Sequence, residues 1–344
     1  MTNQPPVTID TLHRPLKDLR ISVTDRCNFR CTYCMPHDEY DWTPKKEILS
    51  YEEVARLCAL FCQLGVEKVR LTGGEPLVRQ DLENLVGMLR EIPGLKDISL
   101  TTNGALLTAA RAQRLKESGL SRVNVSLDSL RPERFAQINR RGKLAQVLAG
   151  ISAAKKAGLG PVKINAVILR GVNDDEIIDL FEFARQESLQ LRFIEYMDVG
   201  QANGWDFSRT MTQAEILQVL SAHSKLNKRG RREDRAPAME FVSEKGDATL
   251  GVIASVTEPF CGSCSRARLT ADGKLVACLF AQDGFDLRAP LREGASDAEL
   301  SAMIEGVWAK RGDRYSEERL EAILSERGYD PSDHKKIEMI RLGG

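Results

Sequence analysis

The stretch "LRISVTDRCNFRCTYCMP", residues 19–36, decides how the rest of the chain is interpreted. Its first six residues are rich in β-branched side chains and predict a short strand. Cys27, Cys31 and Cys34 follow, with three residues between the first pair and two between the second. Because three thiols are one short of a closed tetrahedral site, the stretch predicts a strand that ends in an incomplete metal-binding loop.

Outward from this stretch, β-rich runs alternate with longer segments that carry apolar residues at helical spacing. The further strand-like runs are 66–74, 97–104, 122–129, 162–169 and 191–197. The helical segments between the runs are 50–65, 81–92, 108–119, 143–158 and 174–188. At least six such units predict an α/β protein with a parallel sheet, in the form of a full or partial β/α barrel of the TIM type. From the pattern alone, a doubly wound open sheet is the alternative.

The loops that follow these runs are where we expect the functional site, because the carboxyl ends of parallel strands carry it in either architecture. Those loops contain Asp25 to Cys34, Gly73 to Pro76, Asn103, Gly104, Asp128, Gly171 to Asp174, and Met197 to Gly200. The cysteine triplet is therefore expected to lie at the site.

The alternation of strand-like runs and helical segments stops after about Gly204. In the charged stretch 225–238 acids interrupt the bases, which favours an exposed loop over a binding patch. Two amphipathic segments follow at 297–310 and 317–327. Since 344 residues exceed the usual size of a single core, we expect this C-terminal part to be an appendage of the barrel.

Composition excludes several classes of protein. The chain is 42% apolar, and its 49 lysines and arginines balance 49 acids, so no net charge favours nucleic acid or an acidic membrane as a partner. No apolar run approaches the roughly 20 residues that span a bilayer. The opening residues lack the apolar core of a signal peptide. We therefore expect a cytoplasmic protein that binds neither nucleic acid nor membranes.

Two kinds of metal centre fit the cysteines. Cys261 and Cys264 form a CxxC pair and Cys278 follows after thirteen residues, so a second group is again one thiol short. Zinc could close the first group with His37, but four ligands would then crowd one short loop. Closely spaced thiols suit an iron–sulfur cluster better, because each thiol binds a different iron and one iron stays open.

The other arginine, cysteine and histidine residues considered near or outside the triplets are expected to have different roles. Arg266 and Arg268, just after the second CxxC pair, predict an anion close to that site. Cys58 and Cys62 lie four apart on one helical face and are expected to pack as small core residues. If the first group holds a cluster, His37 is an ordinary loop residue.

A second motif, "TGGEP" at 72–76, follows the second run, and its paired glycines permit a ligand to approach the backbone. CxxxCxxC after one strand and GGEP after the next resembles the radical S-adenosylmethionine (SAM) enzymes. Over nearly the whole chain, the sequence is similar to the MoaA family of GTP 3′,8-cyclases, which begins molybdenum cofactor biosynthesis. The segments that carry this likeness are "LRISVTDRCNFRCTYCMP", "VRLTGGEPLVRQDL", "LTTNG", "VNVSLDSL", "KINAVILRGVNDDEI", "RFIEYMDVG", "FCGSCSRARLTADGKL" and the final "GG". The departures are Ser265, where the family commonly has Asn, and Arg341 and Leu342, where an aromatic residue and Ile are frequent.

The resemblance implies a partial barrel with a C-terminal cluster-binding extension. Residues 1–15 would be an N-terminal tail and 16–230 the radical SAM barrel. Residues 231–335 would bind an auxiliary cluster, and 336–344 would be a tail whose two glycines reach into the active site.

It also implies a set of site residues. Two [4Fe-4S] clusters would be ligated by Cys27, Cys31 and Cys34 and by Cys261, Cys264 and Cys278. SAM would contact Tyr33, Gly74, Ser126 and Met197. GTP would contact Arg20, Arg70, Thr101, Lys163, Arg266, Ala267 and Arg268. The phosphate-loop motif GxxxxGK[ST] is absent, which favours triphosphate binding by scattered cations at strand ends or beside the clusters, Arg192 among them. For Lys163, an edge position with its tip in solvent is the alternative.

The implied reaction converts GTP to (8S)-3′,8-cyclo-7,8-dihydroguanosine 5′-triphosphate. The first cluster would pass an electron to SAM, and the resulting 5′-deoxyadenosyl radical would remove the 3′ hydrogen of GTP. The second cluster would bind the purine through its open iron, and no side chain is assigned a catalytic role. The implied partners are a reductant such as flavodoxin or ferredoxin, a downstream cyclic pyranopterin monophosphate synthase, and a second copy of the chain in a homodimer.

Two other functions fit the cysteines less well. A SAM enzyme that modifies a peptide usually carries more cysteines near its C-terminus than the three found here. A zinc-stabilised binding protein is the alternative without catalysis, and it would be colourless after anaerobic purification, whereas iron–sulfur clusters are brown.

Overall fold

The computed structural model describes residues 7–232, 235–325 and 328–343. Within them, twelve strands form one sheet in the order β12-β11-β10-β1-β2-β3-β4-β5-β6-β9-β8-β7. The six strands from the predicted runs are β1 (Asp18–Ser22), β2 (Lys68–Thr72), β3 (Asp97–Thr102), β4 (Arg122–Ser126), β5 (Lys163–Ile168) and β6 (Gln190–Glu195). Adjacent members of this set pair in parallel, which confirms the predicted parallel sheet.

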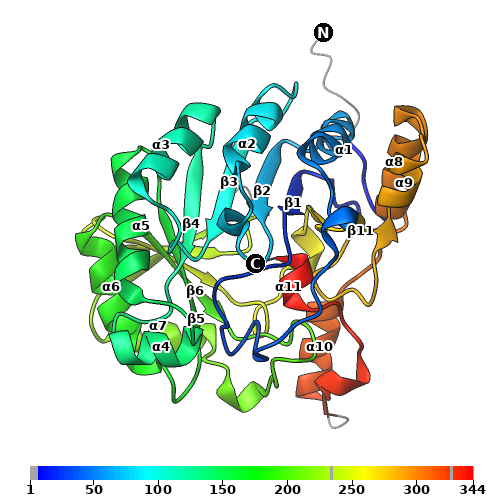
Figure 1. The fold of residues 1–344 in the computed structure, drawn as a ribbon. Helices are drawn as coiled ribbons and strands as arrows, with labels where there is room; N and C mark the ends of the chain where they lie inside the picture. The colour runs from blue at the N-terminus through cyan, green and yellow to red at the C-terminus, as the bar shows by residue number, and fades with distance from the viewer. Residues whose placement is uncertain (1–6, 233–234, 326–327, 344) are drawn as a thin grey trace.

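The helices between these strands confirm the five predicted helical segments. They are α1 (Tyr51–Gln63), α2 (Leu82–Arg90), α3 (Ala109–Ser118), α5 (Leu144–Lys156) and α6 (Ile177–Gln186). Figure 1 shows them along the outside of the curved sheet. The strands β1 to β6 follow one another in sequence order, without the reversal that marks a doubly wound sheet, so the fold is a partial β/α barrel. In the part of the chain that the structure describes, β12 and β7 are not paired with each other and the barrel is not closed.

The C-terminal part of the chain extends both edges of this sheet. The added strands are β7 (Leu226–Arg231), β8 (Met239–Ser243), β9 (Thr249–Ile253), β10 (Arg266–Leu269), β11 (Lys274–Val276) and β12 (Phe285–Asp286). β10 pairs in parallel with β1, which places Arg268 opposite Arg20, and β9 pairs in parallel with β6. The second cysteine triplet is therefore brought next to the strand that precedes the first.

The remaining helices only partly match the sequence prediction. They are α4 (Pro132–Asn139), α7 (Gln213–Ser221), α8 (Arg288–Arg292), α9 (Asp297–Ala309), α10 (Tyr315–Leu324) and α11 (Met339–Leu342). The segments predicted at 297–310 and 317–327 are confirmed as α9 and α10, although Arg327 lies outside the described residues. α4 and α7 were not predicted, but Thr212 and Glu215 form a capping box that marks the start of α7.

The interpretation of 225–238 as an exposed loop is wrong in its first half, where β7 forms an antiparallel pair with β8. β7 is the last strand of the sheet, and Lys228 and Arg229 remain exposed on it. A charged edge strand needs no apolar pattern, because its side chains stay in water while its backbone pairs on one side. The charged composition of β7 is therefore the reason that the sequence did not predict this strand.

Side chains alternate between two environments along the central strands. Leu19 and Ile21 of β1 are buried in the apolar layer that also contains Cys58 and Cys62 of α1, which confirms the core assignment of these two cysteines. Arg20, between those two residues, lines a cavity on the opposite face. Within the described residues, no helix combines the length and apolar character needed to cross a membrane.

Candidate functional site

One cavity of about 290 Å³ brings the two cysteine triplets together. All six cysteines of the triplets line it. So do the predicted site residues Arg20, Tyr33, Arg70, Gly74, Thr101, Ser126, Met197, Arg266 and Arg268. Two predicted residues do not line it: Ala267 is buried in the apolar layer, and Lys163 lies at a neighbouring cavity.

The loop after β1 holds the first triplet by backbone contacts. The carbonyl of Cys31 accepts hydrogen bonds from the N–H groups of Cys34 (3.0 Å) and Met35 (2.7 Å). The Phe29 N–H lies 3.4 Å from Cys27 Sγ and donates to it. The buried Arg30 guanidinium donates to the carbonyls of Cys27 (2.9 Å) and Phe29 (2.8 Å). The three thiols are thus presented on a pre-shaped loop.

The donor set of this loop fits an iron–sulfur cluster. Burial raises the pKa of Cys27 to about 11 and that of Cys34 to about 12, so a metal must displace a proton from each thiol to bind. In the described ranges, no three His, Cys, Asp or Glu side chains are arranged to hold one shared metal ion. A cluster separates its thiolates, because each binds its own iron, whereas zinc needs all its ligands around one ion. The exposed His37 is not among the residues that line the cavity.

The two glycines of TGGEP serve the cysteine loop itself. A Cβ atom on Gly73 would collide with the Thr24 backbone, and one on Gly74 would collide with the Arg26 backbone. The Gly74 N–H donates to the Thr24 carbonyl at 2.7 Å, and the Glu75 N–H donates to the Arg26 carbonyl at 2.8 Å. The close approach expected for a ligand is thus made, in this structure, by the loop that carries the triplet.

Glu75 connects this motif to the loop after β3. Its buried carboxylate accepts hydrogen bonds from Thr102 Oγ1 (2.7 Å) and from the N–H groups of Asn103 (2.7 Å) and Leu77 (3.0 Å). Burial raises its pKa, while these donors favour the ionised form. Asn103 in turn donates to Asn28, beside Cys27. The sequence placed Glu75 and Asn103 at strand ends but gave neither a role.

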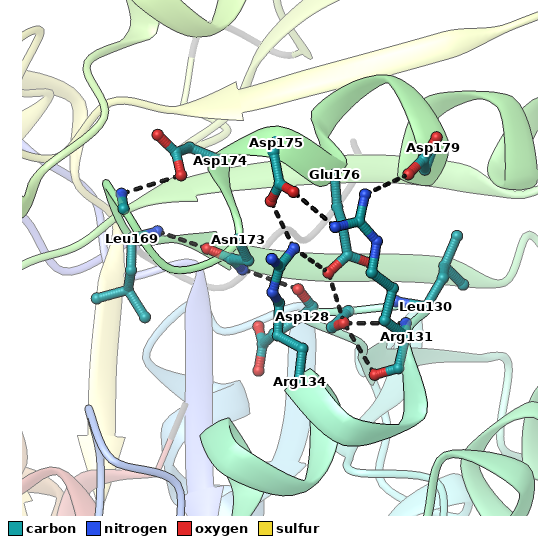
Figure 2. A network of polar contacts seen from close by, with 12 residues as sticks. Asp128, Leu130, Arg131, Arg134, Leu169, Asn173, Asp174, Asp175, Glu176 and Asp179 are labelled. Atoms are coloured by element: carbon teal, nitrogen blue, oxygen red, sulfur yellow. Dashed lines mark hydrogen bonds and ion pairs between the residues drawn. The ribbon is translucent and has the colours of Figure 1, made fainter.

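Asp128 connects the loop after β4 to the cysteine loop, as Glu75 connects the TGGEP motif to the loop after β3. Its carboxylate accepts hydrogen bonds from Tyr33 Oη at 2.8 Å and from the Val167 N–H at 2.9 Å, and burial raises its pKa to about 6. Figure 2 shows the polar network behind it, in which Asn173 donates to the Asp128 carbonyl at 2.8 Å. In the same network, the buried Glu176 carboxylate accepts from the Leu130 N–H at 2.7 Å and from Arg134 at 2.8 Å. The aromatic ring predicted to contact SAM is therefore fixed by a buried carboxylate.

Guanidinium groups surround the second triplet instead. The buried Arg14 donates to the Cys261 carbonyl at 2.9 Å, and the buried Arg311 donates to the Cys264 carbonyl at 2.8 Å. Burial alone would raise the pKa of Cys264, but Arg266 and Arg311 lower it to about 6. Arg14 and Arg311 each retain one buried nitrogen without a hydrogen-bond partner among the described residues. This donor set fits an anionic metal cluster, and neither arginine was predicted.

Ser265, where the family commonly has Asn, does not line the cavity. Ser265 is buried, and its hydroxyl donates to the Asp18 carboxylate at 2.7 Å. Its carbonyl accepts the N–H groups of Lys17 and Asp18, each at 3.1 Å. The residue therefore joins the second triplet to the start of β1.

A row of cations lies between the two triplets. Arg20, Arg70 and Arg192 are each the third residue of their strand, so they lie inside the barrel rather than at the strand ends where we expected them. Loss of hydration and mutual repulsion lower the pKa of Arg70 to about 9 and that of Arg192, despite nearby Glu240, to about 10. The pKa of Arg20 is also lowered, by burial first and then by Arg268. Among the described residues, no carboxylate forms an ion pair with any of four arginines: Arg20, Arg70, Arg192 and Arg268.

A second cavity, of about 320 Å³, continues from these cations toward the amino ends of the strands. Arg20, Arg70, Arg192 and Arg266 line both cavities. Lys163, the first residue of β5, lines the second and is only 6% exposed, so the edge-lysine alternative is wrong. Burial and the neighbouring arginines lower its pKa to about 7. The further cations around this cavity, which the sequence did not single out, are Lys68, Arg122, Arg232 and Arg235.

The end of the chain returns to the site. Arg268 donates to the carbonyls of Leu342 (3.1 Å) and Gly343 (2.7 Å), and Gly343 lies so close to Thr72 and Gly73 that a side chain would not fit. In Figure 1, α11 lies near the centre of the view, beside the strands. Leu342 is buried and Arg341 is exposed, whereas Gly344 lies outside the described residues.

Comparisons with known proteins agree with this geometry. Residues 21–184 match the Radical SAM superfamily, and residues 189–317 match the family described as Molybdenum Cofactor Synthesis C. SuiB of Streptococcus suis, solved bound to S-adenosylmethionine, has a TM-score of 0.59 at 15% identity, over 90% of this chain and 69% of that one. The structure of anSMEcpe with bound AdoMet has a TM-score of 0.56 at 18% identity, over 77% and 72%. The fold is thus that of a radical SAM enzyme.

Curated relatives narrow the class. A GTP 3′,8-cyclase of Acidothermus cellulolyticus is 46% identical over 97% of this chain and 98% of the relative. A GTP 3′,8-cyclase of Staphylococcus aureus is 44% identical over the same shares. The chain belongs to the GTP 3′,8-cyclase family of radical SAM enzymes.

Proposed function

We propose that this protein converts GTP to (8S)-3′,8-cyclo-7,8-dihydroguanosine 5′-triphosphate, the first step of molybdenum cofactor biosynthesis. The observation that carries the proposal is the row of cations between two cysteine triplets. Buried arginines that have no carboxylate partner among the described residues repel one another, and an anion that enters the cavity offsets that repulsion. A nucleoside triphosphate supplies such an anion.

The protein's own residues orient two ligands in this proposal. Tyr33, Gly74, Ser126 and Met197 line the part of the cavity assigned to SAM. Arg20, Arg70, Thr101, Arg266 and Arg268 line the part assigned to GTP, and Ala267 contributes no side chain to it. Lys163 and the second cavity suit the triphosphate, which would extend past the shared arginines. Holding both ligands in one enclosed space brings the reacting atoms together and excludes water.

Two [4Fe-4S] clusters complete the proposed site, one on Cys27, Cys31 and Cys34 and one on Cys261, Cys264 and Cys278. When bound, the clusters and SAM supply the 5′-deoxyadenosyl radical chemistry and an open iron for the purine. The carbonyls of Cys261 and Cys264 are already fixed by Arg14 and Arg311, which supports the second centre.

The wider setting is also part of the proposal. We assign 1–15 to an N-terminal tail, 16–230 to the barrel, 231–335 to the auxiliary-cluster domain and 336–344 to the C-terminal tail. The protein would work as a cytoplasmic homodimer with an electron donor such as flavodoxin or ferredoxin. A cyclic pyranopterin monophosphate synthase would consume its product.

Anaerobic purification followed by SAM cleavage tests the proposal. We expect a brown protein with about eight irons per chain, as two cubane clusters require. After reduction, it should form 5′-deoxyadenosine only when GTP is present and consume GTP in step. Cys27→Ala should stop both reactions, while Cys62→Ala, a core cysteine outside the triplets, should leave them intact. A colourless zinc protein, or deoxyadenosine formation indifferent to GTP, refutes the assignment.

A further inference from the structure

Asp198 is a buried carboxylate that the proposed chemistry does not use. It follows Met197 in the loop after β6, and its side chain is fully buried. Tyr315 Oη donates to it at 2.6 Å, and Tyr329 Oη and Arg319 also donate to it. Lys336 Nζ lies 2.7 Å from its carboxylate and 3.0 Å from its carbonyl oxygen. Four side chains thus converge on one acid.

All four partners come from the last thirty residues of the chain. Tyr315 and Arg319 lie on α10, while Tyr329 and Lys336 lie in the segment that leads to α11. Burial alone would raise the pKa of Asp198, but Arg319, Lys336 and the two tyrosines lower it to about 2, so the group is ionised at neutral pH. A buried acid with two buried cations is costly to break, because any partner removed leaves another charge unpaired. This cluster therefore ties the C-terminal segment to the loop after β6.

Further contacts lead from this cluster to the cavity. The Ile337 N–H donates to the Ala281 carbonyl at 3.0 Å, and the Gln201 N–H donates to the Glu338 carboxylate at 3.0 Å. α11 follows at once, and Met339 lines the cavity. The carbonyls of Leu342 and Gly343 then accept from Arg268.

We propose that Asp198 is a positioning residue whose ion pair with Lys336 fixes residues 337–343 in the cavity and thereby orients Arg268. The functional half of this inference rests on the proposed GTP chemistry, in which Arg268 contacts the nucleotide. The structural half, a tail held by Asp198, stands without it. Asp198 touches no reacting atom and acts only through the tail.

Hydrogen–deuterium exchange of Lys336→Met tests the structural half. Its matched control is Lys335→Met, because Lys335 is the adjacent lysine but is exposed. We expect the amides of 337–343 to exchange roughly 10- to 100-fold faster in Lys336→Met, because the substitution removes the charge-assisted hydrogen bond to the Asp198 carboxylate. Amides of β1 to β6 should be unchanged, and Lys335→Met should match the unmodified protein. An unchanged tail, or faster exchange spread over the whole sheet, overturns the proposal.

Steady-state kinetics test the functional half. In Lys336→Met, the KM for GTP should rise severalfold while the KM for SAM changes less, because the tail contacts Arg268. Asp198→Asn should show a larger form of the same pattern if it folds, and Lys336→Met decides the matter if it does not. Equal increases in both KM values refute the link to Arg268. If the unmodified protein does not consume GTP, the proposed function fails, but the exchange comparison still decides the role of Asp198.

Discussion

The two cysteine triplets that line the cavity have different electrostatic surroundings. At the first triplet, the nearby ionisable groups include the carboxylates of Glu75 and Asp128 and the guanidinium of Arg30, and burial keeps the thiols of Cys27 and Cys34 neutral. At the second, Arg266 and Arg311 lower the pKa of Cys264 to about 6, although burial opposes them. SAM carries a sulfonium cation and GTP is a polyanion. The comparison suggests a hypothesis that the following experiments test: the arginines beside the second triplet favour GTP there, and the carboxylates beside the first triplet favour SAM.

The largest expected effect comes from removing the proposed second cluster alone. Cys278→Ala should reduce the iron content from about eight to about four per chain. Product should fall below detection because the iron that we propose anchors the purine is lost, while SAM binding is kept. Iron analysis, SAM binding and product assays check this, with Cys58→Ala as a core control. Full product formation by Cys278→Ala would show that the two triplets are not distinct in function.

A smaller effect is expected from the row of cations. Arg192→Met removes a charged donor that lines both cavities and should weaken GTP binding roughly 10- to 100-fold, as loss of a charge-assisted hydrogen bond does. SAM binding should stay within about twofold because carboxylates lie beside the first triplet. Calorimetry with each ligand measures both. Arg229→Met, on an exposed position of β7, should change neither, and equal losses for the two ligands would contradict the separation by charge.

Because of Lys163, we expect the affinity for GTP to depend on pH more strongly than the affinity for SAM. Its pKa is lowered to about 7 in the free protein, so above that pH GTP must bind together with a proton. A bound polyanion favours the charged lysine, and GTP affinity should therefore fall by up to about tenfold per pH unit between pH 7 and 9. SAM affinity should not show this slope. In Lys163→Met the slope for GTP should disappear, and a slope that survives the substitution assigns it to another group.

The smallest effect is expected at a carboxylate beside the first triplet. Asp128→Asn removes a charge but keeps groups that can bond to Tyr33 and Val167, so SAM binding should weaken by roughly two- to fivefold. GTP binding should be unchanged. Asp41→Asn, an exposed aspartate in the loop after β1, serves as the control in fluorescence or calorimetric titrations. A larger loss for GTP than for SAM would reverse the assignment of the two ligands.

Local patterns predicted most of the fold. Six β-rich runs and five amphipathic segments became strands and helices because alternation and helical spacing are properties of adjacent residues. The same alternation in LRIS already separates apolar from polar faces, and it explains why Arg20 lies inside the barrel. The strand β7 was missed because a charged edge strand and a solvated loop have the same composition.

The supports of the site could not be predicted in this way. Arg14 contacts Cys261, which lies 247 positions away, and Asp198 contacts Lys336, which lies 138 positions away. Such pairs depend on how the edges of the sheet meet, and no local spacing marks them. The cysteines were found because their spacing is local, whereas the arginines and acids that tune them are brought close only by the fold.

The place of β10 has a consequence for synthesis on the ribosome. β1 leaves the ribosome early, yet one of its two neighbours is β10, which begins at Arg266. Until that residue emerges, β1 presents an open edge next to the loop of Cys27, and open edges recruit other strands. A chain halted before Arg266 would therefore both lack Cys278 of the second triplet and be prone to self-association. Because β10 pairs with β1 late in synthesis, the sheet and the cavity are completed together.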